Sequence, residues 1–280
     1  MFGAYFGLAV AYMLGRPAQS AESEANSVSD TFSLIGTLFL FIYWPSFNGG
    51  GLEPNSSAQQ RAVIATIFAL CASTVGTFFA SSFLNTTHKF RPLDIQNATL
   101  AGGVAIGSVC DLTLSLSDRL LIGFVAGVVS ALGFAYMQAW LETSCAVHDT
   151  CGIHNLHGLP SLIGGLASVV LCYVKAPLGH DIPAVFAHSN QASIQLAAIA
   201  VTLALAVSSG LFSGWLLNAV AALSTTDLYS DAPYWEVEHE GDGEQHGEGH
   251  HTDSSKSKQQ YPYTSLEIQQ GKAGTSPYHH

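Results

Sequence analysis

The sequence predicts an all-α membrane protein, a polytopic bundle of transmembrane helices. Hydrophobic residues make up 48% of the 280 residues and charged residues only 10%, whereas an ordinary soluble domain has about a quarter charged residues. About six stretches approach the roughly 20 apolar residues that a helix needs to cross a bilayer. Gly, Ser and Thr interrupt several of them, which is typical of helices that pack closely against one another. The stretches are residues 31–47, 61–84, 95–116, 120–141, 156–174 and 193–223.

The chain begins with a shorter apolar run. Residues 1–14, MFGAYFGLAVAYML, lack the basic start and the small-residue cleavage site of a signal peptide. They are also too short to span a bilayer comfortably. We therefore expect a partial transmembrane helix over residues 1–14, a polar connector loop over 15–30, and a membrane domain of about six helices over 31–223.

The last part of the chain has a different composition. Residues 224–280 include the acidic, His-rich run EVEHEGDGEQHGEGHH and show no apolar periodicity, so we expect a disordered tail. Clustered histidines also suit weak binding of a transition metal. The basic loop THKFRP, Thr87 to Pro92, is expected to be cytoplasmic. Alternation over the predicted spans then makes the tail cytoplasmic as well.

The lipid bilayer is an expected partner because of the apolar stretches, and the charges give little information on any other partner. Much of the net charge of −11 lies in or near the tail, and the nine Lys and Arg residues are dispersed along the chain. A protein that binds nucleic acid usually gathers its basic residues on one patch or stripe. The composition therefore excludes nucleic acid as an expected partner.

Ionisable groups stand at the start of one predicted span, in HDTCGIHNLHGLP, His148 to Pro160. Such groups are costly inside a membrane and indicate function, usually beside a cavity or a packed interior. If the chain is helical from residue 149, Asp149 and His157 share a broad face and differ in depth by about 12 Å. His157 is the candidate functional histidine, and a packed, hydrogen-bonded core histidine is the alternative. His154 and His157 have a spacing that suits a metal. A zinc site needs about three or four ligands, and no further ligand shares an obvious face, so no metal site is predicted.

Two other polar or aromatic groups stand in or at the end of spans. Trp44 and Phe47, in YWPSFN, lie on one helical face, where Trp could attract a small cation and Phe47 could form a constriction. An aromatic belt at the membrane interface is the alternative. Asn97 and Thr99 lie in the Gly-rich run IQNATLAGGVAIG. We expect both to form structural hydrogen bonds to a neighbouring helix.

Five blocks in this order resemble the Rhesus (Rh) glycoprotein branch of the ammonium transporter/Mep/Rh family. The resemblance covers about residues 1–238 and implies the second inverted repeat plus the last helix of an ammonium transporter-like fold. Members of the family are trimers that conduct ammonia through a pore in each subunit, and some Rh members have been linked to carbon dioxide. The blocks are MFGAYFGLAVAYML, GTLFLFIYWPSFN, IQNATLAGGVAIG, DTCGIHNLHGLPSLIGG and DAPYWEVE.

The resemblance also implies residue roles. His157 matches the second of the family's paired pore histidines, and Phe47 matches one of two stacked phenylalanines at the outer mouth. Trp44 matches an aromatic residue of the outer vestibule, and Asp149 matches a buried acidic residue below the pore helix. The first pore histidine and the first repeat have no counterpart here, so we expect an N-terminally truncated member of the family.

The predicted function is ammonium and ammonia transport, in which the cation is recruited and neutral ammonia is conducted. No cofactor or enzymatic activity is expected. The expected assembly is a homotrimer or a complex with full-length Rh subunits, in the plasma membrane. Four alternatives stay open: a non-conducting truncated subunit, a gene fragment, a carbon dioxide channel, and a metal-dependent membrane hydrolase that uses Asp149, His154 and His157.

Overall fold

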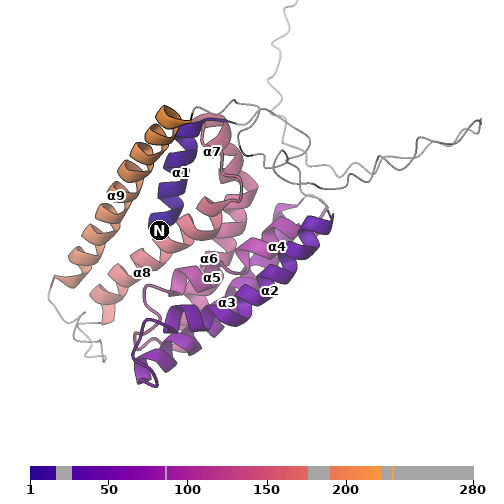
Figure 1. Ribbon diagram of the computed structural model, residues 1–280. Coiled ribbons are helices and arrows are strands. Elements are labelled where there is room, and N and C mark those ends of the chain that lie inside the picture. Colours follow the sequence, from indigo (N-terminus) through magenta and orange to yellow (C-terminus); the bar gives the residue numbers. More distant parts are fainter. Residues whose placement is uncertain (17–26, 86, 176–189, 222–228, 230–280) are drawn as a thin grey trace, which may run out of the picture. The chain divides into compact units, whose positions relative to one another are not determined.

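The computed structural model describes residues 1–16, 27–85, 87–175, 190–221 and 229 (Figure 1). Within this part of the chain the regular structure is helical, and the π-helices are labelled η. The helices are α1 (Phe2–Leu14), α2 (Ser27–Gly49), α3 (Ser57–Leu84), α4 (Pro92–Ala98), α5 (Ala101–Ile106), α6 (Leu116–Leu132), η2 (Gly133–Met137), α7 (Gln138–Cys145), η3 (His154–Gly158), α8 (Leu159–Lys175) and α9 (Gln191–Val220).

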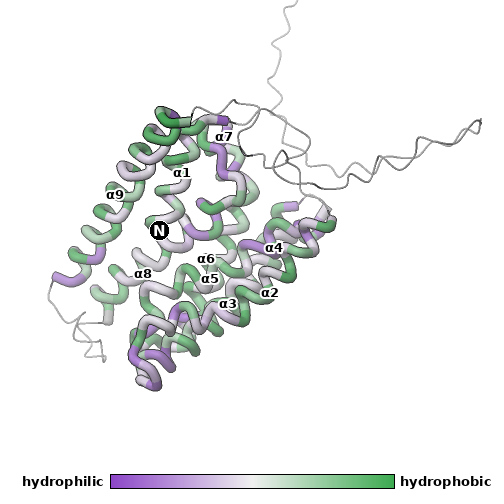
Figure 2. The backbone as a smooth tube through the Cα atoms, in the orientation of Figure 1, coloured by the Kyte–Doolittle hydropathy of each residue, from purple (hydrophilic) through white to green (hydrophobic). Residues whose placement is uncertain are grey.

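The described residues contain five helical segments that are long and apolar enough to cross a membrane. Apolar residues run along most of their length, and hydrophilic residues gather toward the ends (Figure 2). The prediction of an all-α, multi-pass membrane protein is therefore confirmed. The five segments are Ser27–Gly49, Ser57–Leu84, Leu116–Cys145, His154–Val174 and Gln191–Val220.

The stretch predicted as one span over residues 95–116 is broken in the structure. It forms two short helices, α4 and α5, separated at Thr99 and Leu100. Ser73 of α3 bridges the break, because its hydroxyl donates to the Ala98 carbonyl oxygen at 2.9 Å and accepts from the Gly102 N–H at 3.0 Å. Irregular backbone at membrane depth is tolerated where protein buries it and satisfies its polar groups. The break therefore depends on α3 and could not be read from its own residues.

Glycines allow two helix pairs to pack at backbone distance. A Cβ atom on Gly123 of α6 would meet the Ala69 carbonyl oxygen of α3, and one on Gly127 would meet that of Ser73. On α9, a Cβ atom at Gly210 would lie 2.5 Å from the Phe6 carbonyl oxygen of α1. Small residues of this kind are typical of helix contacts inside membranes, where there is no hydrophobic drive between helices.

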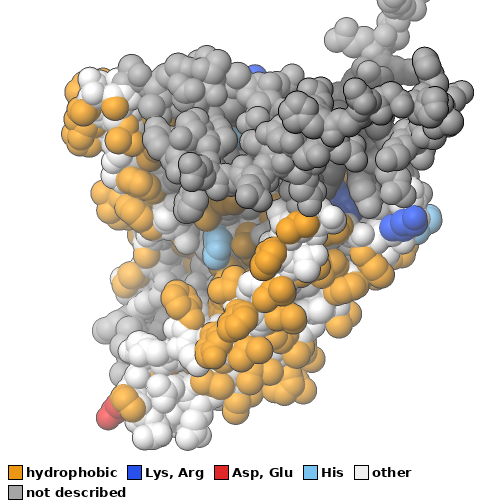
Figure 3. Space-filling model, turned by 45° about the vertical axis from the view of Figure 1, so that its right-hand side comes forward, with side chains coloured by type: hydrophobic (Ala, Val, Ile, Leu, Met, Phe, Trp, Pro, Cys, Tyr) orange, Lys and Arg blue, Asp and Glu red, His pale blue; other side chains and the backbone are white. Residues whose placement is uncertain are grey.

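The outer surface of the helices is apolar. In the apolar window of α2 no residue is buried, and in α9 only 11% of the window is. The space-filling view shows broad fields of hydrophobic side chains, and few Lys, Arg, Asp or Glu side chains are visible among the described residues of this face (Figure 3). An exposed apolar surface of this extent is unusual for a soluble monomer and suits contact with lipid.

The predicted boundaries agree only approximately with the helices. The short apolar run at the start forms α1, whereas α2 begins at Ser27, inside the expected connector over residues 15–30. Of the expected tail over 224–280, the structure describes only Tyr229. The disorder and the cytoplasmic position of that tail lie outside the described residues and stay predictions.

Candidate functional site

Asp149 holds the start of the helix that carries His157. Its Oδ1 accepts from the backbone N–H of Ile153 and its Oδ2 from that of His154, both at 2.9 Å. The residue is only 7% exposed. The first N–H groups of a helix have no partner within the helix, and a carboxylate there also meets the positive end of the helix dipole. Helix η3 begins at His154, not at residue 149, so Asp149 acts from the preceding turn.

The rings of His157 and Trp44 stack on each other. Their centroids lie 6.2 Å apart with an interplanar angle of 19°, although one ring comes from η3 and the other from α2. Trp44 also meets Phe47 edge to face at 6.4 Å and 63°. The structure therefore brings His157 beside Trp44 and Phe47, which come from a distant part of the chain. Trp44 and Phe47 were predicted to share a helical face, but the contact of Trp44 with His157 was not predicted.

Trp44 and Phe47 have different surroundings. Trp44 is 9% exposed and packs in a cluster with Leu70 and Leu100. A Cβ atom on Gly103 would lie 2.7 Å from the indole Nε1, so glycine is needed beside this ring. The Nε1–H has no hydrogen-bond partner among the described residues. Phe47 is 81% exposed. The two rings are therefore in contact with each other, and the ring of Trp44 is buried whereas that of Phe47 is exposed.

His154 has neighbours that differ from those of His157. It is buried, meets the ring of Tyr5 edge to face at 5.9 Å and 86°, and its Nδ1 lies 3.3 Å from Asn155 Oδ1. In the described part of the chain no three His, Cys, Asp or Glu side chains are placed to hold a metal ion. Among the described residues, neither histidine therefore belongs to a group of ligands that could hold a metal ion.

The side chains of Asn97 and Thr99 form hydrogen bonds, but not to a neighbouring helix. Asn97 donates to the Leu93 carbonyl oxygen at 2.9 Å, and Thr99 donates to that of Ile95 at 2.7 Å. Both bonds stay in their own segment, so the expected bonds to a neighbouring helix are not formed by these atoms.

Asn48 and Ser73 form such bonds instead. The Asn48 Nδ2 donates to Thr66 Oγ1 of α3 and to the Gly103 carbonyl oxygen of α5, each at 3.0 Å. Its position directly after Phe47, at the polar end of an apolar run, is the signal that could have identified it.

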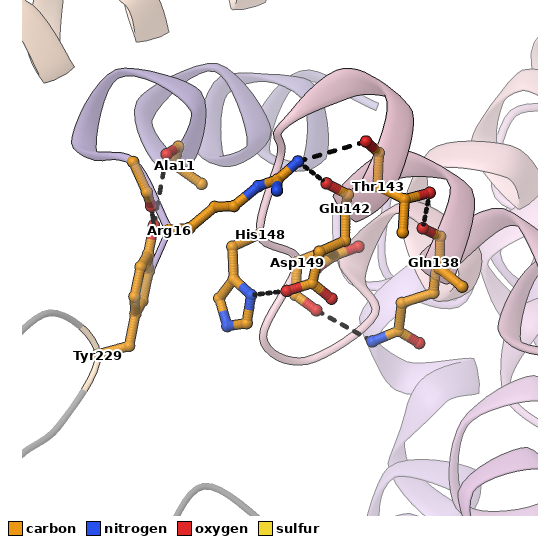
Figure 4. Close-up of polar contacts among 10 residues, drawn as sticks. Ala11, Arg16, Gln138, Glu142, Thr143, His148, Asp149 and Tyr229 are labelled. Carbon is orange, nitrogen blue, oxygen red and sulfur yellow. Dashed lines mark hydrogen bonds and ion pairs between the residues drawn. The ribbon is translucent and has the colours of Figure 1, made fainter. Parts of the chain in front are cut away.

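A second polar cluster lies around the loop that contains Asp149 (Figure 4). Arg16 donates to the carbonyl oxygens of Glu142 and Thr143 near the end of α7. His148 Nδ1 lies 3.1 Å from Glu142 Oε1, and its ring lies 4.9 Å from that of Tyr229. The cluster ties the C-terminal ends of α1 and α7 together, directly before Asp149.

The same loop contains two further features that depend on Asp149. The Gln138 side chain donates to the Asp149 carbonyl oxygen at 3.0 Å, which fastens the loop to α7. Burial and, to a lesser degree, the Asp149 carboxylate raise the pKa of the Cys151 thiol. The turn at Asp149 is therefore bonded to α7 through its carbonyl oxygen and to the start of η3 through its carboxylate.

Comparison with known proteins finds consistent relatives. The sequence profile of the Ammonium Transporter Family matches residues 1–242. Ammonium transporter Rh type A of Bos taurus is 40% identical over 241 residues, which are 84% of this chain and 54% of that protein. Ammonium transporter Rh type C of Xenopus laevis is 40% identical over 262 residues, or 88% and 55% of the two chains. The chain thus spans about half the length of the curated relatives it matches.

Solved structures agree with these sequence matches. Rh50 of Nitrosomonas europaea superposes with a TM-score of 0.66 at 34% identity, over 81% of this chain and 55% of that one. Mep2 of Saccharomyces cerevisiae superposes with a TM-score of 0.65 at 22% identity, over 83% and 53%. At this lower identity the likeness shows the fold alone.

Proposed function

Because the chain belongs to the ammonium transporter family, we propose that it is the pore-forming part of an Rh-type channel that recruits ammonium and conducts neutral ammonia. The observation that carries the proposal is the stacked pair of His157 and Trp44 beside Phe47. His157 lies at the start of the membrane-length segment His154–Val174, and Trp44 lies near the end of the segment Ser27–Gly49. A transport site needs polar or aromatic groups within the membrane-spanning segments, whereas a helix that only anchors the chain does not.

The chemistry of the three side chains suits this substrate. Burying a hydrated cation in an apolar passage is very costly, whereas neutral ammonia avoids most of that cost. An aromatic face attracts a cation by the quadrupole of its ring, and Trp does so best. A neutral imidazole offers one donor and one acceptor without a permanent charge. In this mechanism Phe47 and Trp44 form the mouth, and His157 exchanges hydrogen bonds with the ammonia that passes.

Two other residues support the proposed site without touching the substrate. Asp149 fixes the first N–H groups of η3 and thereby the position of His157. Asn97 stabilises α4 by its bond to the Leu93 carbonyl oxygen, beside the break that lies next to α5. We assign both to structural support of the pore.

The proposal includes an assembly and a location. The chain spans only 54–55% of two relatives named as ammonium transporters, and the channel activity is proposed for a homotrimer or for a complex with full-length Rh subunits. The proposed location is the plasma membrane. The proposed function is transport rather than catalysis, and it requires no metal or cofactor.

Ammonia flux in proteoliposomes tests the proposal. The chain is co-expressed with the N-terminal half of an Rh relative, and stopped-flow fluorescence follows internal alkalinisation after an ammonia gradient is imposed. His157→Ala is expected to lower the flux about tenfold, which corresponds to the loss of roughly one hydrogen bond in the rate-limiting step. His88→Ala, which changes an exposed histidine in the loop before α4, is the matched control. Equal fluxes in the two variants would refute the assignment of His157.

A further inference from the structure

Three fully buried polar side chains lack a hydrogen-bond partner in the described part of the chain. They are the amide nitrogen of Asn155 on η3 and the hydroxyls of Ser130 on α6 and Thr77 on α3. Each residue has a relative exposure of 0%. Leaving a buried donor or acceptor unpaired is expensive, and most such groups in proteins are paired with protein or with ordered water.

Ser130 and Asn155 lie on two helices that are in contact, α6 and η3. A Cβ atom on Gly133 would lie 2.6 Å from Asn155 Oδ1, so the amide of Asn155 packs against that turn. A Cβ atom on Gly127 would lie 2.9 Å from Ser73 Oγ of α3. Ser130 lies three residues after Gly127 and three before Gly133. Residues three apart lie on neighbouring parts of one helix face, so the Ser130 hydroxyl points between α3 and η3.

Thr77 lies at the same level on α3. Helices α3 and α6 run in the same direction, because three contacts spread along α3 advance in the same order along α6. These contacts are Ala69 with Gly123, Ser73 with Gly127, and Ala80 in one cluster with Ala131. Thr77 follows Ser73 by one turn and precedes Ala80, as Ser130 follows Gly127 and precedes Ala131. The two hydroxyls therefore occupy matching positions in this register.

The Asn155 amide limits what can pair with it. Its Oδ1 is engaged with His154 Nδ1 at 3.3 Å, and an amide oxygen can only accept. The amide nitrogen can only donate, so a group that pairs with it must carry a lone pair. The hydroxyls of Ser130 and Thr77 can donate or accept, so they can complete the bonds of a molecule that has its own hydrogens.

We propose that Thr77, Ser130 and Asn155 form a binding site for one small neutral molecule that has both a lone pair and hydrogen-bond donors. Water and ammonia have this chemistry. Ammonium does not fit, because it has no lone pair to accept from the Asn155 amide. The site itself stands independently of the transport function, and only a preference for ammonia over water would rest on that function.

The bound molecule would join three elements. It would link α3 and α6 to η3, the helix that carries His157, close to where η2 meets η3. Single turns of π-helix are rare and frequently lie at functional sites. A molecule held there would fix η3 through the Asn155 side chain, in addition to the Asp149 bonds to its first N–H groups.

A high-resolution structure of the full chain in lipid nanodiscs tests the site. Data are collected in ammonium-free buffer and again with ammonium chloride at alkaline pH, where ammonia is abundant. We expect a density peak about 2.7–3.2 Å from the Asn155 amide nitrogen and from at least one of the two hydroxyls. A peak in the ammonium-free buffer shows that the site holds water there, and a peak only with ammonium chloride identifies ammonia. Absence of such a peak in both conditions would overturn the proposal.

Matched variants sharpen the test. Asn155→Leu keeps a similar volume but removes the amide, and it is expected to abolish the peak. Ser168→Ala is the control, because Ser168 is also buried but donates to the Gly165 carbonyl oxygen of its own helix at 2.6 Å; it should keep the peak. Should Asn155→Leu fail to fold, the two structures of the unaltered chain still decide. Unchanged flux in His157→Ala would remove the transport proposal and leave a peak in ammonium-free buffer unaffected.

Discussion

The contact between α3 and α6 and the contact between Trp44 and His157 are held together in different ways. The first is formed by glycines that bring one helix against the backbone of the other. The second is formed by two ring faces, and the indole N–H next to it has no partner among the described residues. The glycine contacts of the first pair are made with backbone atoms, whereas the ring contact of the second is made by the side chains of Trp44 and His157. We infer that the first contact is the frame and the second is the working part.

The frame is expected to tolerate substitution least. In Gly123→Val the new side chain would collide with the Ala69 carbonyl oxygen, and overpacking of this kind costs up to about 3 kcal/mol. Thermal or denaturant unfolding of the purified chain measures the loss. Gly36→Val is the control, since nothing lies within 4 Å of a Cβ atom at that glycine. Equal stabilities of the two variants would show that the α3–α6 contact is not a backbone contact.

The Asp149 cap fixes the start of η3, the helix that carries His157 of the ring contact. Asp149→Ala removes two charge-assisted bonds to the start of η3 and is expected to lower the free energy of unfolding by about 2 kcal/mol. The same unfolding experiment measures the loss. Glu53→Ala, at an exposed loop position, should be close to neutral. A neutral Asp149→Ala variant would mean that η3 is held by its packing alone.

The ring contact itself is expected to contribute less to stability. Trp44→Leu removes the stacking on His157, which is worth about 1 kcal/mol beyond the area that it buries. Trp140→Leu, which changes an indole that is 52% exposed, serves as the reference in unfolding experiments. The account is contradicted if Trp44→Leu is the more stable of the two.

The smallest effect concerns a reaction rate near the cap. Because burial and the Asp149 carboxylate raise the pKa of the Cys151 thiol, the thiolate fraction at neutral pH is lower than in a free cysteine. Alkylation of Cys151 by iodoacetamide, followed by mass spectrometry, should therefore be slow and should accelerate as the pH rises. Asp149→Asn is expected to increase the rate, since it removes the neighbouring charge. A rate equal to that of a cysteine peptide across this pH range would contradict the raised pKa.

The sequence predicts the frame better than it predicts the working part. Apolar length alone identifies α2, α3 and α9, because a span needs a minimum number of apolar residues. It does not show the break between α4 and α5, because Ser73 from another helix completes the backbone bonds there. Local residue patterns predict a helix well, but they do not show a side chain from another helix that stabilises a break in it.

The site could be predicted only residue by residue. Trp44 and His157 each stand out as an aromatic or ionisable group at the end of a span, yet no spacing rule relates α2 to η3. The π-helical turns also have no sequence signature among the residues involved, so the helix start at His154 rather than at residue 149 was not foreseen. The roles of Trp44, Phe47, His157, Asp149 and Asn97 stay predictions.

A double-mutant cycle on ammonia flux tests the central claim most directly. The claim is that Trp44 and His157 act on the substrate as one unit, and residues that act as a unit show non-additive losses. Trp44→Leu, His157→Ala and the double variant are compared in the proteoliposome assay. The account predicts that the double variant loses no more flux than the worse single variant. Losses that multiply would contradict it, because they would show that the two rings act independently.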